Sequence, residues 1–214
     1  MTHPYLKVKS TLPKNCQIIA VSKLQPSEKI IEVYKLGQRH FAENYVQEAI
    51  KKISDVNKED ICWHFIGSLQ KNKVKDVVGR FEFIHSIDNL ALAETIQKYA
   101  QKLNLTQKIF IQVNLSLEET KGGVYKEDLS HLIEAISKLQ NIKIVGLMTM
   151  PPLNIDTENT RIFFQELKKL QIVLNKKFPD LTELSMGTSS DYLVAAEEGA
   201  TFVRLGTILF GDRK

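Results

Sequence analysis

The stretch Gln17-Ile-Ile-Ala-Val-Ser22 is apolar at four consecutive positions and is followed directly by Lys23. A strand with one face in solvent alternates apolar and polar residues, whereas a strand buried on both faces is apolar nearly throughout. The run therefore predicts a buried strand of a parallel sheet, with Lys23 at its carboxyl end.

Seven further runs have the length and β-rich composition of strands, and helical patterns lie between them. The expected strands cover residues 17–22, 40–43, 63–67, 83–86, 109–114, 144–149, 183–186 and 202–205. The clearest helical patterns place apolar residues three or four positions apart, at Leu129, Leu132, Ile133 and Ile136 and at Phe163, Leu167, Leu170 and Leu174. Eight βα units of about 27 residues predict an α/β fold, a single (β/α)8 TIM barrel over residues 1–214. A doubly wound open sheet fits less well, because no Gly-x-Gly-x-x-Gly follows the first strand.

Composition narrows the class of protein. The 214 residues are 43% hydrophobic and 25% charged, which excludes a disordered chain. The net charge of +4 is spread along the sequence, so we expect no nucleic-acid partner. No apolar run has the length of a membrane span and no secretion signal is evident, so we expect a cytoplasmic protein without a membrane partner. Cys16 and Cys62 have neither a CxxC spacing nor an accompanying His pair, and we expect no disulfide and no metal site.

Lys23 is the first residue with a chemical role, because active sites of barrels lie at the carboxyl ends of the strands. A lysine that emerges from so apolar a strand is expected to be partly desolvated, and desolvation favours the neutral amine. A neutral lysine amine is the nucleophile that forms a Schiff base with a carbonyl compound. The alternative is a lysine that extends to solvent or pairs with a carboxylate.

The carboxyl ends of the last two strands have the composition of a phosphate site. Gly187 permits close approach of the backbone, Ser189 and Ser190 offer hydroxyls, and the helical pattern that follows offers unpaired N–H groups. The eighth strand ends at Arg204-Leu-Gly-Thr207, which adds Gly206 and further N–H donors. Ordinary turn chemistry would explain either glycine alone. Combined with Lys23, these loops predict a site for pyridoxal 5′-phosphate (PLP) or for a sugar phosphate.

Several separate motifs resemble one family in the same order. They are Ala20-Val-Ser-Lys23, Phe41-Ala-Glu-Asn-Tyr-Val-Gln-Glu48, Trp63-His-Phe-Ile-Gly67, Gly146-Leu-Met-Thr149, Leu184-Ser-Met-Gly187 and Val203-Arg-Leu-Gly206. On these residues the chain resembles the YggS/PROSC family of pyridoxal phosphate homeostasis proteins, from about residue 17 to residue 211. The resemblance implies a barrel like the N-terminal domain of alanine racemase. Roughly the first 16 residues form a shortened segment with little room for the leading helix of the family.

The resemblance also implies roles for individual residues. Lys23 matches the lysine that holds PLP as a Schiff base, and Arg204 matches the arginine that meets the pyridine nitrogen. Ser189 and the turn of Gly206 and Thr207 correspond to phosphate contacts. Two further residues are implied near the cofactor, Asn44 in the segment after the second strand and Met148 on the sixth strand.

Arg204 bears on whether the protein is an enzyme. An arginine that is always charged can only donate a hydrogen bond, so the pyridine nitrogen opposite it stays unprotonated and the ring is a weak electron sink. Racemisation also needs acid and base groups on both faces of the substrate. In alanine racemase a second domain supplies the opposing tyrosine, and we expect no such domain in this protein. We therefore expect a monomeric carrier that takes part in PLP homeostasis and delivers PLP to PLP-dependent apoenzymes. A PLP-dependent amino-acid enzyme and a Schiff-base aldolase stay open as alternatives.

Other candidate residues are expected to be structural. His64 and His85 fit hydrogen-bonded histidines of the core better than ligands, and Trp63 fits packing between barrel and helices. The loop over residues 114–123, which contains Glu118, Glu119, Lys121 and two glycines, is a candidate cover for the site.

Overall fold

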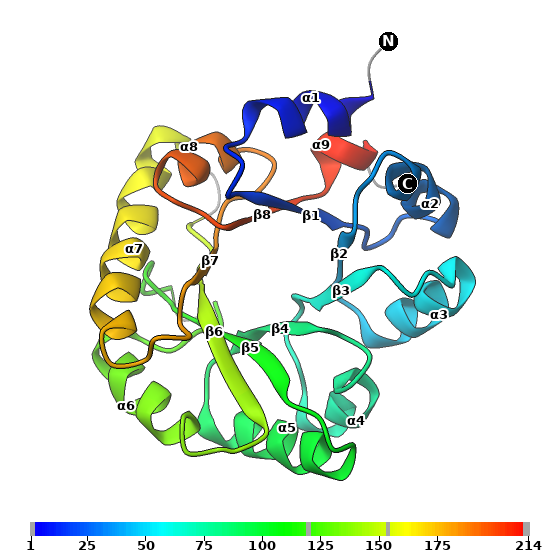
Figure 1. Ribbon diagram of the computed structural model, residues 1–214. Helices are drawn as coiled ribbons and strands as arrows, with labels where there is room; N and C mark the ends of the chain where they lie inside the picture. Colours follow the sequence, from blue (N-terminus) through cyan, green and yellow to red (C-terminus); the bar gives the residue numbers. More distant parts are fainter. Residues whose placement is uncertain (1–2, 119–120, 153–154, 212–214) are drawn as a thin grey trace.

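Eight parallel strands close into a barrel in the computed structural model, which describes residues 3–118, 121–152 and 155–211. The strands are β1 (Gln17–Val21), β2 (His40–Glu43), β3 (Cys62–Phe65), β4 (Phe83–Ile87), β5 (Gln107–Gln112), β6 (Ile142–Met148), β7 (Glu183–Ser185) and β8 (Phe202–Leu205). Each strand pairs with the next, and β8 pairs with β1, so the sheet has no free edge (Figure 1). The predicted (β/α)8 barrel is confirmed.

Helices form a ring around the barrel (Figure 1). They are α1 (Pro4–Thr11), α2 (Ser27–Lys35), α3 (Val46–Val56), α4 (Val74–Val77), α5 (Leu90–Lys102), α6 (Lys126–Ile136), α7 (Arg161–Asn175), α8 (Tyr192–Glu197) and α9 (Thr207–Phe210), with short 3-10 turns η1 (Lys71–Lys73) and η2 (Glu158–Thr160). Both periodic apolar patterns fall on helices, α6 and α7. None of the helices within the described ranges combines the length and the apolar composition that a membrane span requires.

The core has two layers, as the alternation of side chains along barrel strands requires. The outer layer fills the space between strands and helices and includes Trp63, which is buried as expected. The inner layer fills the barrel and includes Ile19, Phe110 and Phe202. Two histidines belong to the inner layer: the His85 ring stacks on Phe110 with centroids 4.1 Å apart, and the His64 ring stacks on a neighbouring phenylalanine.

The N-terminal segment departs from expectation. The sequence predicts little room for a leading helix, but Pro4–Thr11 forms α1. Tyr5 and Val8 lie on one face of this helix and are buried, and α1 packs against α9 at the other end of the chain (Figure 1). Two buried side chains one turn apart are sufficient to hold a short helix when a partner helix is present. That partner is a tertiary feature, so local sequence does not reveal it.

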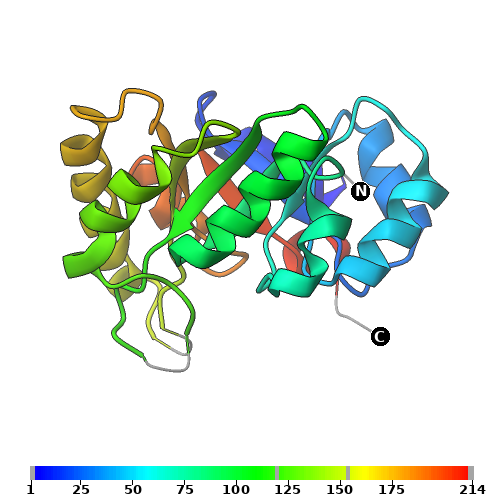
Figure 2. The same cartoon turned by 90° about the horizontal axis from the view of Figure 1, so that it is seen from below.

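The segments after β5 and β6 extend from the same end of the barrel (Figure 2). Lys121 Nζ donates a hydrogen bond to the carbonyl oxygen of Pro151, at 2.8 Å, which ties the two segments together. Asn114 Nδ2 donates to the carbonyl oxygens of Glu118 and Lys121 and so organises the base of the first segment. Glu119, part of the candidate cover, lies outside the described residues.

Candidate functional site

A cavity of about 330 Å³ opens at the carboxyl ends of the strands. The seven residues that the resemblance assigns to the cofactor all line it, namely Lys23, Asn44, Met148, Ser189, Arg204, Gly206 and Thr207. They come from both ends of the chain, and the closure of β8 on β1 brings them together. The structure thus assembles in one place the groups that the sequence distributes over nearly 200 residues.

Strand ends position the main side chains. Lys23 follows β1 and is half-buried, Asn44 follows β2, and Met148 is the buried last residue of β6. Arg204 points from β8 into the barrel, with only 5% of its surface exposed. Because β8 and β1 are paired in register, with Arg204 opposite Ile19, the guanidinium lies deeper in the barrel than Lys23.

The electrostatic character of the cavity is positive. Its lining includes the two cations Lys23 and Arg204, and none of its described lining residues is a carboxylate. Burial lowers the pKa of Arg204 to about 10, while the charge of Asp191 acts in the opposite direction. The guanidinium therefore remains charged at neutral pH. A buried cation that forms no ion pair with the described residues favours an anionic or hydrogen-bond-accepting ligand.

Arg204 is held by two hydrogen bonds. Its Nη1 donates to Ser185 Oγ at 2.8 Å, and its Nη2 donates to the carbonyl oxygen of Thr149 at 3.0 Å. Ser185 Oγ in turn lies 2.9 Å from His85 Nδ1. These contacts fix the direction of the guanidinium, because the fork of N–H groups has little freedom once two of them are bound.

A chain of hydrogen bonds continues from Arg204 down the inside of the barrel. His85 Nε2 lies 2.9 Å from His64 Nδ1, and His64 Nε2 lies 2.9 Å from His40 Nδ1. Burial holds the pKa values of His64 and His85 well below the usual range, so both rings are neutral. Arginine only donates, so Ser185 Oγ accepts a hydrogen bond from Arg204. The Ser185 hydroxyl then donates its own proton to His85 Nδ1. The protons of His85 and His64 then lie on Nε2, and the chain runs from Arg204 to His40.

The loops after β7 and β8 are joined by a serine. Ser189 Oγ accepts hydrogen bonds from the backbone N–H groups of Gly206, at 3.3 Å, and Ile208, at 3.4 Å. Asp191 Oδ1 accepts from the backbone N–H of Thr188 at 2.6 Å and so shapes the same loop. The hydroxyl and the N–H groups therefore converge where the sequence predicts a phosphate site.

Gly187 has a packing role that the sequence does not show. Its φ of +88° lies in the left-handed region, and a Cβ there would stand 2.5 Å from the Cβ of Ala195 in α8. We expected this glycine to admit a ligand. In the structure, the missing side chain of Gly187 instead allows helix α8 to pack closely against this loop. The loop residues that follow Gly187 thereby reach the rim of the cavity.

The turn that carries Lys23 rests on a buried ion network. Lys52 Nζ donates to the carbonyl oxygen of Ser22 at 2.5 Å and contacts Glu43 at 2.8 Å and Glu48 at 2.5 Å. Glu48 also accepts from the backbone N–H of Leu24 at 2.6 Å. The residues on both sides of Lys23 are thus fixed. Lys52 was not predicted from the sequence, although its spacing from Ala49 and Val56 places it on the buried face of α3.

His64 and His85 are both fully buried and hydrogen-bonded, as expected for histidines of the core. The expectation that Cys62 lacks a His pair is wrong. Cys62 Sγ lies 3.5 Å from His64 Nε2, and His40 completes the group. The parallel register of β2 and β3 pairs His40 with Cys62, and no spacing within one segment of sequence reveals such a contact.

Comparisons with known proteins agree with this geometry. The model of the alanine racemase N-terminal domain family matches residues 1–214. A protein of Aquifex aeolicus named pyridoxal phosphate homeostasis protein is 47% identical over 94% of this chain and 89% of its own length. The structure of PipY from Synechococcus elongatus with PLP bound superimposes with a TM-score of 0.91 at 41% identity, covering 97% of this chain and 98% of PipY.

Alanine racemase of Clostridium difficile shares the fold alone, with a TM-score of 0.78 at 16% identity over 98% of this chain and 55% of the racemase. The extent and identity of the other matches are sufficient to assign the family. The chain belongs to the alanine racemase N-terminal domain family and, within it, to the pyridoxal phosphate homeostasis proteins.

Proposed function

We propose that this protein binds PLP as a Schiff base on Lys23 and acts in PLP homeostasis in the cytoplasm, delivering the cofactor to PLP-dependent apoenzymes. Residues 1–214 form the single PLP-binding domain. The observation that carries the proposal is the cavity in which a lysine amine, a buried arginine and a serine-bridged pair of loops face one another. The relative PipY, solved with PLP bound, supports the same cofactor.

The residues of the cavity fit PLP by their chemistry. Asn44 Oδ1 is buried without a hydrogen-bond partner among the described residues, so a ligand that donates there would remove an energetic cost. Two cations, with no carboxylate among the described lining residues, suit a phosphate ester. The buried Met148 and Val21 give an apolar wall for an aromatic ring.

Each residue then has a distinct task. The Nζ of Lys23 forms a C=N bond with the aldehyde, with loss of one water. The hydroxyl of Ser189 and the turn of Gly206 and Thr207 hold the phosphate. Arg204 donates to the pyridine nitrogen, and its bonds to Ser185 and Thr149 keep it in that direction.

The same arginine argues for a carrier over a catalyst. PLP supplies an electron sink for carbanions when its ring nitrogen is protonated. Arg204 is a donor that remains charged at neutral pH, so it stabilises the unprotonated ring nitrogen. The cofactor is thereby bound while its power to activate amino acids is kept low.

An absorbance titration with PLP tests the proposal. We expect the wild-type protein and Lys71→Ala, which removes an exposed lysine after β3, to gain the visible band of a Schiff base with equal affinity. Lys23→Ala is expected to lose this band and to retain weak binding through the phosphate. An unchanged band in Lys23→Ala would assign the Schiff base to another lysine.

Two outcomes would favour the alternative functions. Multiple turnovers of an amino acid by the pure protein would identify an enzyme. A protein that gains no visible band with PLP but is trapped by borohydride with a sugar phosphate would be a Schiff-base aldolase. Transfer of PLP from the loaded protein to an apoenzyme, faster than release of PLP into buffer, is the result that the carrier function requires.

A further inference from the structure

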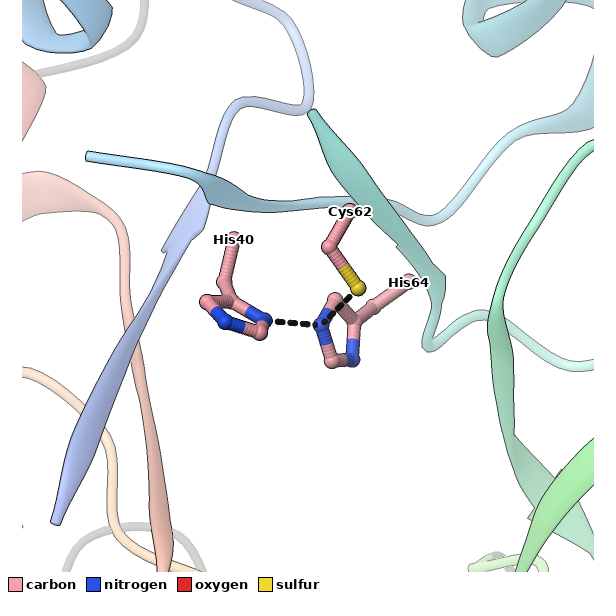
Figure 3. Close-up of side chains that lie close together, drawn as sticks. All are labelled: His40, Cys62 and His64. Carbon is pink, nitrogen blue, oxygen red and sulfur yellow. Dashed lines mark hydrogen bonds between the residues drawn. The ribbon is translucent and has the colours of Figure 1, made fainter. Parts of the chain in front are cut away.

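Three side chains of metal-ligating type meet at the amino end of the barrel, opposite the cavity that contains Lys23. His40 is the first residue of β2, Cys62 is the first residue of β3, and the two are paired across the strands. His64 lies two residues beyond Cys62, so its side chain is on the same face of β3. Figure 3 shows the three side chains pointing toward one another. Their ligand atoms all lie within 4.8 Å of one another.

Two of the three distances between the ligand atoms are close to those of a tetrahedral site, and the third, between His40 and Cys62 Sγ, is at most 4.8 Å. His40 Nδ1 and His64 Nε2 are 2.9 Å apart, and Cys62 Sγ is 3.5 Å from His64 Nε2. In tetrahedral zinc sites, the usual bond lengths place two nitrogens about 3.3 Å apart and a nitrogen and a sulfur about 3.5 Å apart. The sulfur–nitrogen distance already matches, and the two rings need to separate by only a few tenths of an ångström.

The surroundings of His64 resemble those of a histidine that coordinates a metal ion. Its second ring nitrogen, Nδ1, lies 2.9 Å from His85 Nε2, so the ring is oriented by a partner behind it. Histidines that bind metals have such a partner on the nitrogen that faces away from the ion. A cation at Nε2 places the remaining proton of His64 on Nδ1, where His85 accepts it. His85 and Ser185 can follow this change, because each is able both to donate and to accept.

An ion could reach the three side chains from solvent. His40 and Cys62 line an open cavity of about 600 Å³, whose rim also carries Glu82. A neutral imidazole has a nitrogen lone pair to donate to such an ion. Three protein ligands leave the fourth position to water, the arrangement of an open site.

We propose that His40, Cys62 and His64 bind a divalent cation of the Zn²⁺ class at the amino end of the barrel. Two imidazole nitrogens and one thiolate form a donor set that binds Zn²⁺ in preference to the hard cations Mg²⁺ and Ca²⁺. Binding forms one metal–sulfur bond, breaks the S–H bond of Cys62 and releases that proton to solvent. The site is separate from Lys23 and does not depend on the proposed cofactor.

Titration of the full-length protein with Co²⁺ tests this site, because a cobalt–thiolate bond gives a charge-transfer band that oxygen or nitrogen ligands do not. We expect one Co²⁺ per chain with this band in the wild-type protein and in Cys16→Ser. That variant alters the other free cysteine, which is buried. Zn²⁺ added afterwards should displace the cobalt and abolish the band. In Cys62→Ser the band should be absent.

A second variant protects the test against misfolding of Cys62→Ser. His40→Gln changes a half-buried residue at the mouth of the open cavity and should weaken Co²⁺ binding more than tenfold. Lys23→Ala should bind Co²⁺ with the affinity of the wild-type protein. A wild-type protein without a thiolate band, or a band of equal strength in Cys62→Ser, would overturn the proposal. Equal Co²⁺ affinity in wild type and His40→Gln would overturn it as well.

Discussion

Arg204 shows at the scale of single residues how a buried charge acquires a defined direction. Its guanidinium is bound by Ser185 and by the carbonyl oxygen of Thr149, and Ser185 transmits the constraint to His85. The identity and depth of Arg204 follow from the sequence, since it lies inside an apolar strand. Its partners do not, because Ser185 and Thr149 belong to other strands and meet it only when the barrel closes.

Ser185→Ala tests this arrangement. The substitution leaves Arg204 Nη1 and His85 Nδ1 without their shared partner, which should destabilise the fold by about 1–3 kcal/mol. We also expect weaker PLP binding, because the guanidinium loses one of its two anchors. Urea unfolding and PLP titration measure the two effects, with Ser68→Ala, an exposed serine, as control. Unchanged PLP affinity in Ser185→Ala would show that this hydrogen bond does not position Arg204.

At the scale of elements, the predicted strands agree with the structure to within two residues at each end. Two of them, His40–Glu43 and Phe202–Leu205, coincide with it. Strand positions are predictable because a parallel barrel buries both faces, which leaves runs of apolar residues in the sequence. Helix α1 was not predictable, since α9 supplies the surface that it covers.

The contact between β2, α3 and the turn after β1 is a second feature that depends on tertiary structure. Lys52 on α3 reaches Glu43 at the end of β2, and both groups are buried. Burial raises the pKa of Glu43, while the hydrogen bond from Lys52 acts in the opposite direction. The pKa of Glu43 is raised on balance, and Lys52 partly offsets the cost of burying this carboxyl group beneath the turn that carries Lys23.

Lys52→Met is expected to destabilise the protein by about 3–5 kcal/mol, because it leaves a buried carboxylate unpaired. It should also weaken PLP binding, since the carbonyl of Ser22 loses its donor next to Lys23. Lys51→Met is the matched control: its partner Asp55 is exposed, and such surface pairs contribute at most about 1 kcal/mol. The double variant Lys52→Met with Glu43→Gln should recover part of the stability in chemical unfolding. No recovery would contradict the assigned ion pair.

At the scale of the whole molecule, a line of three linked histidines runs through the barrel interior, namely His40, His64 and His85. His64 and His85 have pKa values lowered by burial, so they bind fewer protons in the folded state than in the unfolded chain. Their contribution to stability is fully present above the unfolded pKa, about 6.5, and is lost as the pH falls below it. Glu43, with a raised pKa, contributes in the opposite direction at lower pH.

We therefore expect the free energy of unfolding to decrease below about pH 6.5, by about 1.4 kcal/mol per pH unit for each of the two histidines. His85→Gln retains hydrogen-bonding capacity but does not titrate. The free energy of unfolding of this variant should therefore change less steeply with pH, by the contribution of one histidine. His131→Gln removes an exposed ring on α6 and should keep the wild-type slope. Equal slopes in His85→Gln and wild type would show that His85 does not contribute.

Much of the site was predictable because barrels place their chemistry at the carboxyl ends of the strands. Lys23, Ser189 and Arg204 follow from that rule together with the identity of the residues. The meeting of His40, Cys62 and His64 at the opposite end was not predictable. It depends on the register of two strands, which a sequence without strand partners does not define.

The central claim is that the amine of Lys23 holds the aldehyde of PLP. The most direct measurement is reduction of the PLP-loaded protein with borohydride, followed by proteolysis and mass spectrometry of the peptides. The reduced adduct is predicted on the peptide that contains Lys23, and on no other lysine at comparable yield. An adduct on a different lysine, or a loaded protein that yields no adduct, would contradict the account.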